Sequence, residues 1–387
     1  MSTVVINDCP DYALTKVIDK LEKGIDLLGG WRQFIAPGMK VLLKVNLIGP
    51  KPPDSAAITH AEFVRALTRI LKDHHCDVWI GDSSGGAIAG IAPTARSLVT
   101  SGLQEVAESE GAVIMNFDKE GVVPVKSSID TKPMYLARPL FEADLVINLP
   151  KLKTHSASIF TGAVKNLYGC IPGLRKAKYH RLAPNQFALG QVIADIHAAV
   201  NVGLHVMDGI TAMQGDGPTA GKVYPAEKIL LSTDPLALDT ATASMVGLSI
   251  DDIPILVSAR QRGLGEASLS KIKILGDYTA PPRLAGFRLP KRYRKLRTGQ
   301  RNHRLIVRVI DLLKARPRIS TKLCRGCNMC VESCPVQAIH PETKAINYTT
   351  CIECMCCHEV CMYQAVKLKR DNPVVELAAH LDPRMRS

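Results

Sequence analysis

Short apolar runs alternate with segments of helical periodicity over the first 280 residues of the chain. The runs predict strands at 39–48, 76–82, 112–117, 143–149, 204–210, 228–233 and 271–277. Apolar positions at helical spacing predict helices at 60–75, with Thr59 as the N-cap, and at 97–111, 191–203 and 235–247. This alternation is typical of an α/β domain with a largely parallel sheet. We therefore predict a mostly parallel sheet with flanking helices over residues 1–280.

The alternation ends at Pro281, where a strongly basic segment begins. Residues 281–318 hold thirteen Lys or Arg against one acid, Asp311, and so account for twelve of the chain's formal net charge of +13. Such charge attracts nucleic acid, an anionic membrane surface or an acidic electron carrier. We interpret the segment as a solvated basic linker and favour this over nucleic-acid binding.

The composition argues against membrane and secreted classes. No apolar run reaches the roughly 18 residues of a membrane-spanning helix, and the N-terminal residues lack the pattern of a signal peptide. We therefore expect a soluble, cytoplasmic protein without a membrane span. Nine of the twelve cysteines lie between Cys324 and Cys361, which in such a chain favours metal ligation over disulfides.

The cysteine-rich segment, residues 319–370, contains one motif twice. CRGCNMCVESCP and CIECMCCHEVCM both follow the spacing C-x2-C-x2-C-x3-C, in which the fourth cysteine ligates the other cluster of a two-cluster ferredoxin. The segment resembles bacterial two-cluster 4Fe-4S ferredoxins, which implies a small α+β ferredoxin-like domain with two 4Fe-4S clusters and one-electron transfer. The implied ligands are Cys324, Cys327, Cys330 and Cys361 for cluster one, and Cys351, Cys354, Cys357 and Cys334 for cluster two.

A pair of structural zinc sites is the alternative, since each needs four cysteines. The crossed spacing and Pro335 after the fourth cysteine favour iron–sulfur clusters, although Met362 replaces the second proline. Cys356 is a ninth cysteine without a ligand position. We interpret it as a bystander thiol, with ligand exchange as the alternative. Residues 371–387 are expected to form a tail.

Polar side chains follow several of the predicted strands. They are Lys44 and Asn46, Asp82, the group Lys151, Lys153 and His155, then Asp208, and the pair Asp234 and Asp239. Ligands of open α/β sheets bind beyond the carboxyl ends of the strands, so we expect these side chains to converge. Structural roles remain open for most of them: Lys44 as a snorkelling lysine, Asp82 in a turn, Asp234 as an N-cap, and the lysines in ion pairs with Asp82, Asp208 or Asp239.

Six phrases of the first domain together resemble the family known as domain of unknown function 362. They are VLLKVNL, GDSSGG, INLPKLKTH, AVKNLYG, VMDGITAMQGDGPTAG and STDPLALDT, spread over roughly residues 38–250. Members of this family often carry a ferredoxin module, so the resemblance implies the same two-part organisation. It implies no particular reaction. GDSSGG differs from a protease nucleophile loop by an extra serine, and GDGPTAG is not the G-x-G-x-x-G of dinucleotide-binding folds.

The lysine-rich group is the one that we expect to bind an anion. Lys151 and Lys153 share a face of extended chain, and the start of a short helix carrying Lys165 adds partial positive charge. The expected ligands of a carboxylate or phosphate are Lys44, Asn46, Asp82, Lys151, Lys153, Asn166 and Asp208. The expected catalytic residues are Lys153, Lys165 and His155, the last as proton donor because an unperturbed imidazole titrates near neutrality. Arg175 and His180 are expected to form a lid.

These features together predict an iron–sulfur oxidoreductase. In this hypothesis the ferredoxin module delivers electrons to a small anionic substrate in the α/β domain. Two alternatives stay open: a non-catalytic electron-transfer protein that serves an external donor or acceptor, and a nucleic-acid-associated iron–sulfur protein.

Overall fold

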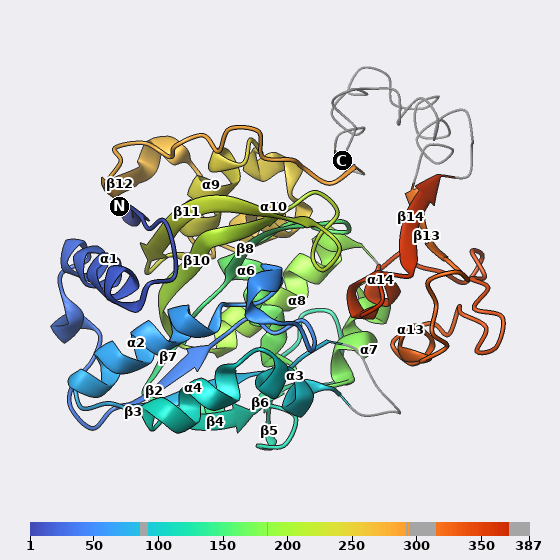
Figure 1. Ribbon diagram of the computed structural model, residues 1–387, viewed down its shortest axis with the longest axis horizontal. Coiled ribbons are helices and arrows are strands. Elements are labelled where there is room, and N and C mark those ends of the chain that lie inside the picture. Colours follow the sequence, from blue (N-terminus) through green and yellow to red (C-terminus); the bar gives the residue numbers. More distant parts are fainter. Residues whose placement is uncertain (86–91, 184, 292, 294–314, 371–387) are drawn as a thin grey trace.

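The computed structural model describes residues 1–85, 92–183, 185–291, 293 and 315–370 (Figure 1). A ten-stranded sheet forms its centre, and β8 (Lys151–His155) and β9 (Ile159–Thr161) lie beside the main path. That path runs through β12 (Ile272–Gly276), β1 (Ser2–Asp8), β11 (Lys222–Ser232), β10 (Val202–Gln214), β7 (Leu145–Asn148), β2 (Lys40–Lys44), β3 (Asp77–Asp82) and β4 (Val113–Asn116). Within this sheet the antiparallel pairs are β1–β11, β10–β11 and β8–β9. The prediction of a mostly parallel sheet is confirmed.

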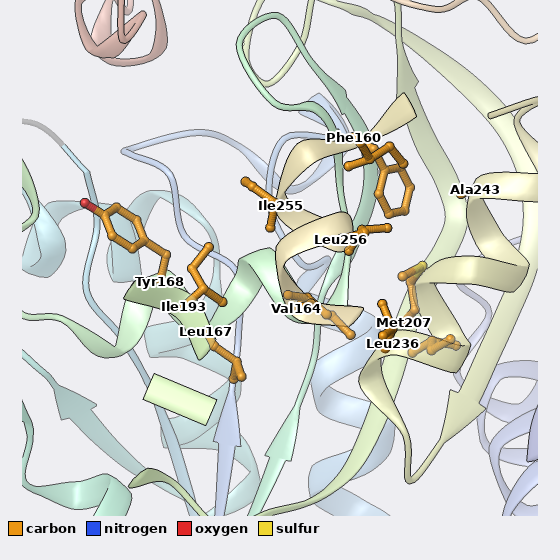
Figure 2. Packing of buried hydrophobic residues seen from close by; sticks show 14 of the residues in the cluster. Phe160, Val164, Leu167, Tyr168, Ile193, Met207, Leu236, Ala243, Ile255 and Leu256 are labelled. Atoms are coloured by element: carbon orange, nitrogen blue, oxygen red, sulfur yellow. The ribbon is translucent and has the colours of Figure 1, made fainter. Parts of the chain in front are cut away.

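Helices cover both faces of the sheet, because successive strand residues point to opposite sides. On β2, Val41 and Leu43 enter one hydrophobic core and Leu42 enters the other. The first core is closed by α1 (Leu14–Leu27), α2 (Ala61–Asp73) and α4 (Leu103–Glu110). The second is closed by α6 (Ala163–Asn166), α8 (Gln186–Ala199), α9 (Pro235–Met245) and α10 (Pro254–Gln261). Figure 2 shows the second core, where Val164 and Leu256 are two of the packed side chains.

Further short elements connect these layers. They are α3 (Thr94–Thr100), α5 (Pro139–Glu142), α7 (Arg175–Leu182), the hairpin of β5 (Val122–Val125) and β6 (Met134–Ala137), and 3-10 turns at Trp31–Gln33, Pro53–Ser55, Leu167–Cys170, Ile250–Asp252 and Leu269–Lys271. No helix in the described part of the chain is long and apolar enough to cross a membrane.

Two predicted helices need correction. The N-cap of α2 is His60 and not Thr59, because the His60 ring accepts a hydrogen bond from Glu62 N. Thr59 Oγ1 instead donates to Leu149 O, 2.7 Å away. The helix predicted at 97–111 is two helices, α3 and α4, separated where Gly102 adopts a left-handed φ of 79°.

The cysteine module forms a small unit beside the sheet (Figure 1). An antiparallel pair, β13 (Ala315–Ile319) and β14 (Val366–Arg370), joins its ends, and α13 (Met329–Glu332) and α14 (Cys356–Val360) lie within it. Residues 281–291 of the predicted linker pack on the α/β domain, where the Arg283 side chain donates a hydrogen bond to Ser244 O. Residues 315–318 of the predicted linker belong to β13, and residues 292 and 294–314, like the predicted tail 371–387, lie outside the described residues.

Candidate functional site

The two halves of the cysteine module repeat one backbone conformation with a constant offset from Cys324 to Cys351. Positive φ angles recur at equivalent positions, in the pairs Gly326 and Glu353, Asn328 and Met355, and Gln337 and Gln364. Equivalent amides also donate to sulfur: Ala338 N to Cys334 Sγ at 3.2 Å and Ala365 N to Cys361 Sγ at 3.1 Å. Hydrogen bonds to ligand sulfurs are among the features that tune iron–sulfur clusters.

The nine cysteines of the module line two small cavities. One cavity is lined by Cys324, Cys327, Cys330 and Cys361, and the other by the expected ligands Cys334, Cys351, Cys354 and Cys357 and by Cys356. Among the described residues, no three His, Cys, Asp or Glu side chains converge on a point suited to a single metal ion. Four thiols around a volume, with amide donors to sulfur, fit a 4Fe-4S cluster in each cavity.

A larger pocket lies between the cysteine module and the sheet. It encloses about 1010 Å³ of empty space, part of it open to solvent. Residues after β2 and at the end of β3 line it, so it lies beyond the carboxyl ends of these strands, where ligands of open α/β sheets bind. Its other wall is the module, through Glu332, Ser333, Cys356, Glu359 and Val360. Both α7 and α14 contribute residues to its lining.

Cys356 faces both the pocket and the second cysteine cavity. It is buried, it lines both spaces, and the expected ligand Cys357 follows it in α14. The pocket and the second cavity therefore share this short helix as a wall.

Three lysines line the pocket without a carboxylate partner among the described residues. Lys153 Nζ donates to Asn46 Oδ1 at 2.6 Å and to Ala57 O at 2.5 Å, and Lys176 Nζ donates to Ser83 Oγ at 2.7 Å. Lys165 Nζ has no hydrogen-bond or ion-pair partner within the described part of the chain. The three ammonium groups therefore lie where an anion would complete their coordination.

Burial lowers the pKa of each of these three lysines. Burial, together with the charge of Lys165, lowers the pKa of Lys153 to about 7. Burial lowers the pKa of Lys176 to about 8, and it lowers the pKa of Lys165 against the opposing charge of Glu359. An anion in the pocket would favour the charged form of all three.

His155 pairs with a carboxylate of the cysteine module. Its Nε2 lies 3.0 Å from Glu359 Oε1, and its Nδ1 accepts from Ala157 N and Ser158 N. Because Nδ1 is an acceptor, the ring proton of the neutral imidazole lies on Nε2, which is close to the carboxylate but makes no hydrogen bond within the described residues. Burial, with help from the Lys165 charge, lowers the pKa of His155 to about 4. The expectation that His155 donates a proton because its imidazole titrates near neutrality is therefore wrong, and His155 is a neutral side chain in contact with Glu359.

Glu359 stays ionised in this surrounding. Burial disfavours its charged form, but His155 and Lys165 outweigh that effect and lower its pKa to about 2. His180, which also lines the pocket, is held neutral because burial lowers its pKa to about 4. His180 and Arg175, which the sequence analysis expected in a lid, both lie in the helix α7.

Lys151 and Asp208 lie outside the pocket and bind each other. Lys151 Nζ is 2.7 Å from Asp208 Oδ2 and donates to the hydroxyl of Tyr12, and both ion-pair partners are fully buried. His60 N and the Tyr12 hydroxyl also donate to the carboxylate. The expectation that Lys151 and Asp208 bind an anion is corrected by this placement: their charges already neutralise each other.

Lys44 and Asp82 form a second internal pair. Lys44 Nζ lies 2.9 Å from Asp82 Oδ1, and the other carboxylate oxygen accepts from Leu47 N at 2.7 Å. Asp82 borders the pocket, but both of its oxygens are engaged, so we assign the pair to joining β2 and β3 rather than to the anion.

The start of the short helix α6 is also occupied. The Asp239 carboxylate accepts from Ala163 N at 2.6 Å and from Val164 N at 2.9 Å, and burial raises its pKa to about 7. This contact explains a carboxylate inside α9 and leaves no N-terminal amide pair for a ligand. Asp234 caps α9, as its position before Pro235 predicted.

Asn46 and Asn166 connect the pocket with the sheet. Asn46 accepts from Lys153 and donates to Asn166 Oδ1 at 2.7 Å, and Asn166 donates to Asn148 Oδ1 at 2.7 Å. The predicted residues that line the pocket are thus Asn46, Asp82, Lys153, His155, Lys165 and Asn166.

Two residues of the pocket were missed by sequence analysis. Lys176 follows no strand, and nothing in the sequence places α7 over β3. Glu359 lies among the cysteines, where spacing draws attention to the ligands. Its position one turn after Cys356 on α14 was the available signal, since it places both residues on one helix face.

Comparison with known proteins places the chain in a family. The model of a domain of unknown function, DUF362, matches residues 41–244, and that of a 4Fe-4S binding domain matches residues 317–340. A thylakoid-associated protein of Synechocystis sp. is 31% identical over 257 residues, which cover 65% of this chain and 77% of that protein.

Two solved structures show more distant similarity. The lactate racemase apoprotein of Thermoanaerobacterium thermosaccharolyticum has a TM-score of 0.38 at 11% identity, over 61% of this chain and 55% of its own. A protein of Thermotoga maritima has a TM-score of 0.39 at 10% identity, over 65% of this chain and 60% of its own. The chain thus spans less than two thirds of either structure. On the family match and the Synechocystis relative, the chain is a member of the DUF362 family that also carries a 4Fe-4S ferredoxin domain.

Proposed function

We propose that this iron–sulfur protein is an oxidoreductase that exchanges electrons with a small organic anion, a carboxylate or a phosphate ester, held in the pocket between its two domains. One observation carries the proposal: α14 forms a wall of the lysine-lined pocket and also a wall of the second cysteine cavity. A substrate in the pocket would therefore lie next to a cluster held in that cavity.

The two sets of four cysteines support two 4Fe-4S clusters, one in each cavity. Such clusters, when bound, supply single electrons at low potential. The chain itself supplies the thiols, the amide donors from Ala338 and Ala365, and the apolar shell of Ile319, Ile339 and Val366 that limits access of water.

The lysines divide the work of binding an anion. Lys165, which has no partner of its own, would contact the charged group directly. Lys153 is fixed by Asn46 and Ala57 O, so it would hold a proton at a defined position beside the substrate. Its pKa of about 7 suits a general acid, because such a group gives up a proton readily at neutral pH. We assign the role of proton donor to Lys153 in place of His155.

Reconstitution tests the clusters. The protein loaded anaerobically with iron and sulfide should bind about eight irons per chain, four for each cluster. Cys361→Ser should lose about half of them, whereas Cys356→Ser, at the ninth cysteine, should keep all. Zinc binding in place of iron, or loss of iron in the Cys356 variant, would contradict this assignment.

Reoxidation tests the substrate class. Dithionite-reduced protein, freed of excess reductant, is mixed with a panel of small carboxylates and phosphate esters, and the return of its visible absorbance reports electron transfer. At least one anion should reoxidise the wild type and fail with Lys165→Met, whose iron content should be normal. If no anion of the panel binds the protein or reoxidises it, the proposal is wrong and a role as electron carrier is favoured.

A further inference from the structure

The two ends of the cysteine module are in different surroundings. The second cavity lies against the α/β domain, where Glu359 contacts His155 and Thr219 Oγ1 donates to Glu359 O. None of the residues that line the first cavity also lines the pocket. Cys327, one of the cysteines of the first cavity, is exposed. All twelve cysteines belong to the described residues, and Cys327 alone among them is exposed. The most exposed cysteine of the module therefore belongs to the first cavity, on the side away from the pocket.

The surface around the first cavity is basic and apolar. Lys322 and Arg325 are exposed on the loop that carries Cys324, and no acid lies between 319 and 331. Leu323 and Tyr363 are each 44% exposed, and Arg325 and Tyr363 line the cavity itself. Lys344 lines it too, from a turn in which Glu342 offsets its charge. We call Lys322, Leu323, Arg325 and Tyr363 the cluster-one face.

The internal repeat supplies a comparison within the chain. The positions equivalent to Lys322, Leu323, Arg325 and Tyr363 in the other half are Thr349, Thr350, Ile352 and Val336. Both halves hold four cysteines in the same conformation, so cluster binding does not require the cations, the leucine or the tyrosine. These residues are thus specific to the half that carries the exposed Cys327.

We propose that the cluster-one face is the docking site of an acidic one-electron carrier protein. The charge selects an acidic partner, because Lys322 and Arg325 would attract a negative surface and accelerate encounter. Leu323 and Tyr363 supply an apolar centre of the kind that protein interfaces use. This inference rests on the proposed function, since it gives the route by which electrons enter or leave the protein.

Two cytochromes of opposite charge test the docking site. Reduced, reconstituted protein is mixed in a stopped-flow instrument with an oxidised acidic c-type cytochrome, or with a basic one. In each case one electron leaves the protein and the haem iron goes from ferric to ferrous, with no proton transferred. The acidic cytochrome should react at least about tenfold faster at low than at high ionic strength.

Charge reversal identifies the surface. The double variant K322E/R325E should slow the acidic cytochrome about tenfold or more at low salt and should not slow the basic one. The matched control T349E/T350E changes exposed residues at the equivalent place in the other half and should leave both rates unchanged. Dithionite, a small reductant, should reduce all three proteins alike.

Three results would overturn the docking site. They are an unchanged rate in K322E/R325E, an equal loss in T349E/T350E, or a faster reaction of the wild type with the basic than with the acidic cytochrome. None of these depends on the anion pocket, so failure here leaves reoxidation by anions intact, and failure of that reaction leaves the cytochrome rates intact.

Discussion

Lys151, the first residue of β8, and Lys165, in α6, show how the surroundings of a lysine decide whether it has a structural partner. Lys151 is buried against Asp208, so its charge is already neutralised by a partner. Lys165 lines a pocket and has no partner within the described residues. Both are lysines near strand ends in the sequence, and only the fold distinguishes them.

Replacing Lys165 should weaken anion binding without affecting stability. A charge-assisted hydrogen bond is worth about 1.5–3 kcal/mol, so Lys165→Met should raise the Kd for sulfate roughly 10- to 150-fold in titration calorimetry. Lys178→Met, on the exposed face of α7 where Lys178 pairs with Asp130, is the control and should bind sulfate as the wild type does. Equal binding by both variants would exclude Lys165 from the site.

Anion binding should weaken as pH rises through 7. The pKa of Lys153 is lowered to about 7, so its ammonium form predominates below that pH and is lost above it. If the charged form alone binds, the Kd for sulfate should rise roughly tenfold between pH 6 and pH 8. Sulfate keeps its charge over this range, so the change in Kd comes from the protein.

Lys153→Met is the control. It should abolish the rise in Kd through pH 7 and leave the smaller effect of Lys176 near pH 8. A profile in Lys153→Met as steep as that of the wild type would contradict the assignment.

Breaking the buried pair should destabilise the domain rather than change its chemistry. Asp208→Asn leaves Lys151 charged and uncompensated, which costs about 3–5 kcal/mol. The free energy of unfolding, from urea titration followed by circular dichroism, measures this loss. Asp251→Asn removes an exposed pair with Arg260 and should cost less than about 1 kcal/mol. Comparable losses in the two variants would show that Lys151 and Asp208 do not form the pair described.

At the scale of elements, the apolar strands were predictable and the functional ones were not. β2, β3 and β7 are apolar runs whose burial on both faces follows from their composition. β8 reads KLKTH, and its pairing with β10 and β9 depends on partners that bury its lysines. Sequence patterns reveal strands by hydrophobicity, so a strand built of buried charges escapes them.

α14 should hold the module against the α/β domain through Glu359. Glu359→Ala removes the contact with His155 and one of the side chains that the module contributes to the pocket wall. Hydrogen exchange should then accelerate at the amides of α7 and α14 while the rest of the sheet keeps its protection. Glu353→Ala, which breaks a pair with Arg316 inside the module, is the matched control and should leave α7 unchanged. Unchanged exchange in Glu359→Ala would mean that the contact does not hold the two parts together.

At the scale of the whole molecule, the sequence predicted two parts and left their relation open. The repeated cysteine spacing implied both ligand sets, and the cavities contain those sets. The position of the module over the strand ends was not predictable, because it depends on contacts such as His155 with Glu359 between residues about two hundred positions apart. That arrangement places a group of lysines and residues of the ferredoxin module around one pocket.

The most direct test of this account is whether an anion in the pocket lies beside a reduced cluster. Pulsed electron–nuclear double resonance on the reduced, reconstituted protein with bound phosphate measures the magnetic coupling between the cluster and phosphorus. We predict a resolved phosphorus coupling in the wild type and its loss in Lys165→Met. Saturated phosphate binding without any phosphorus coupling would contradict the account.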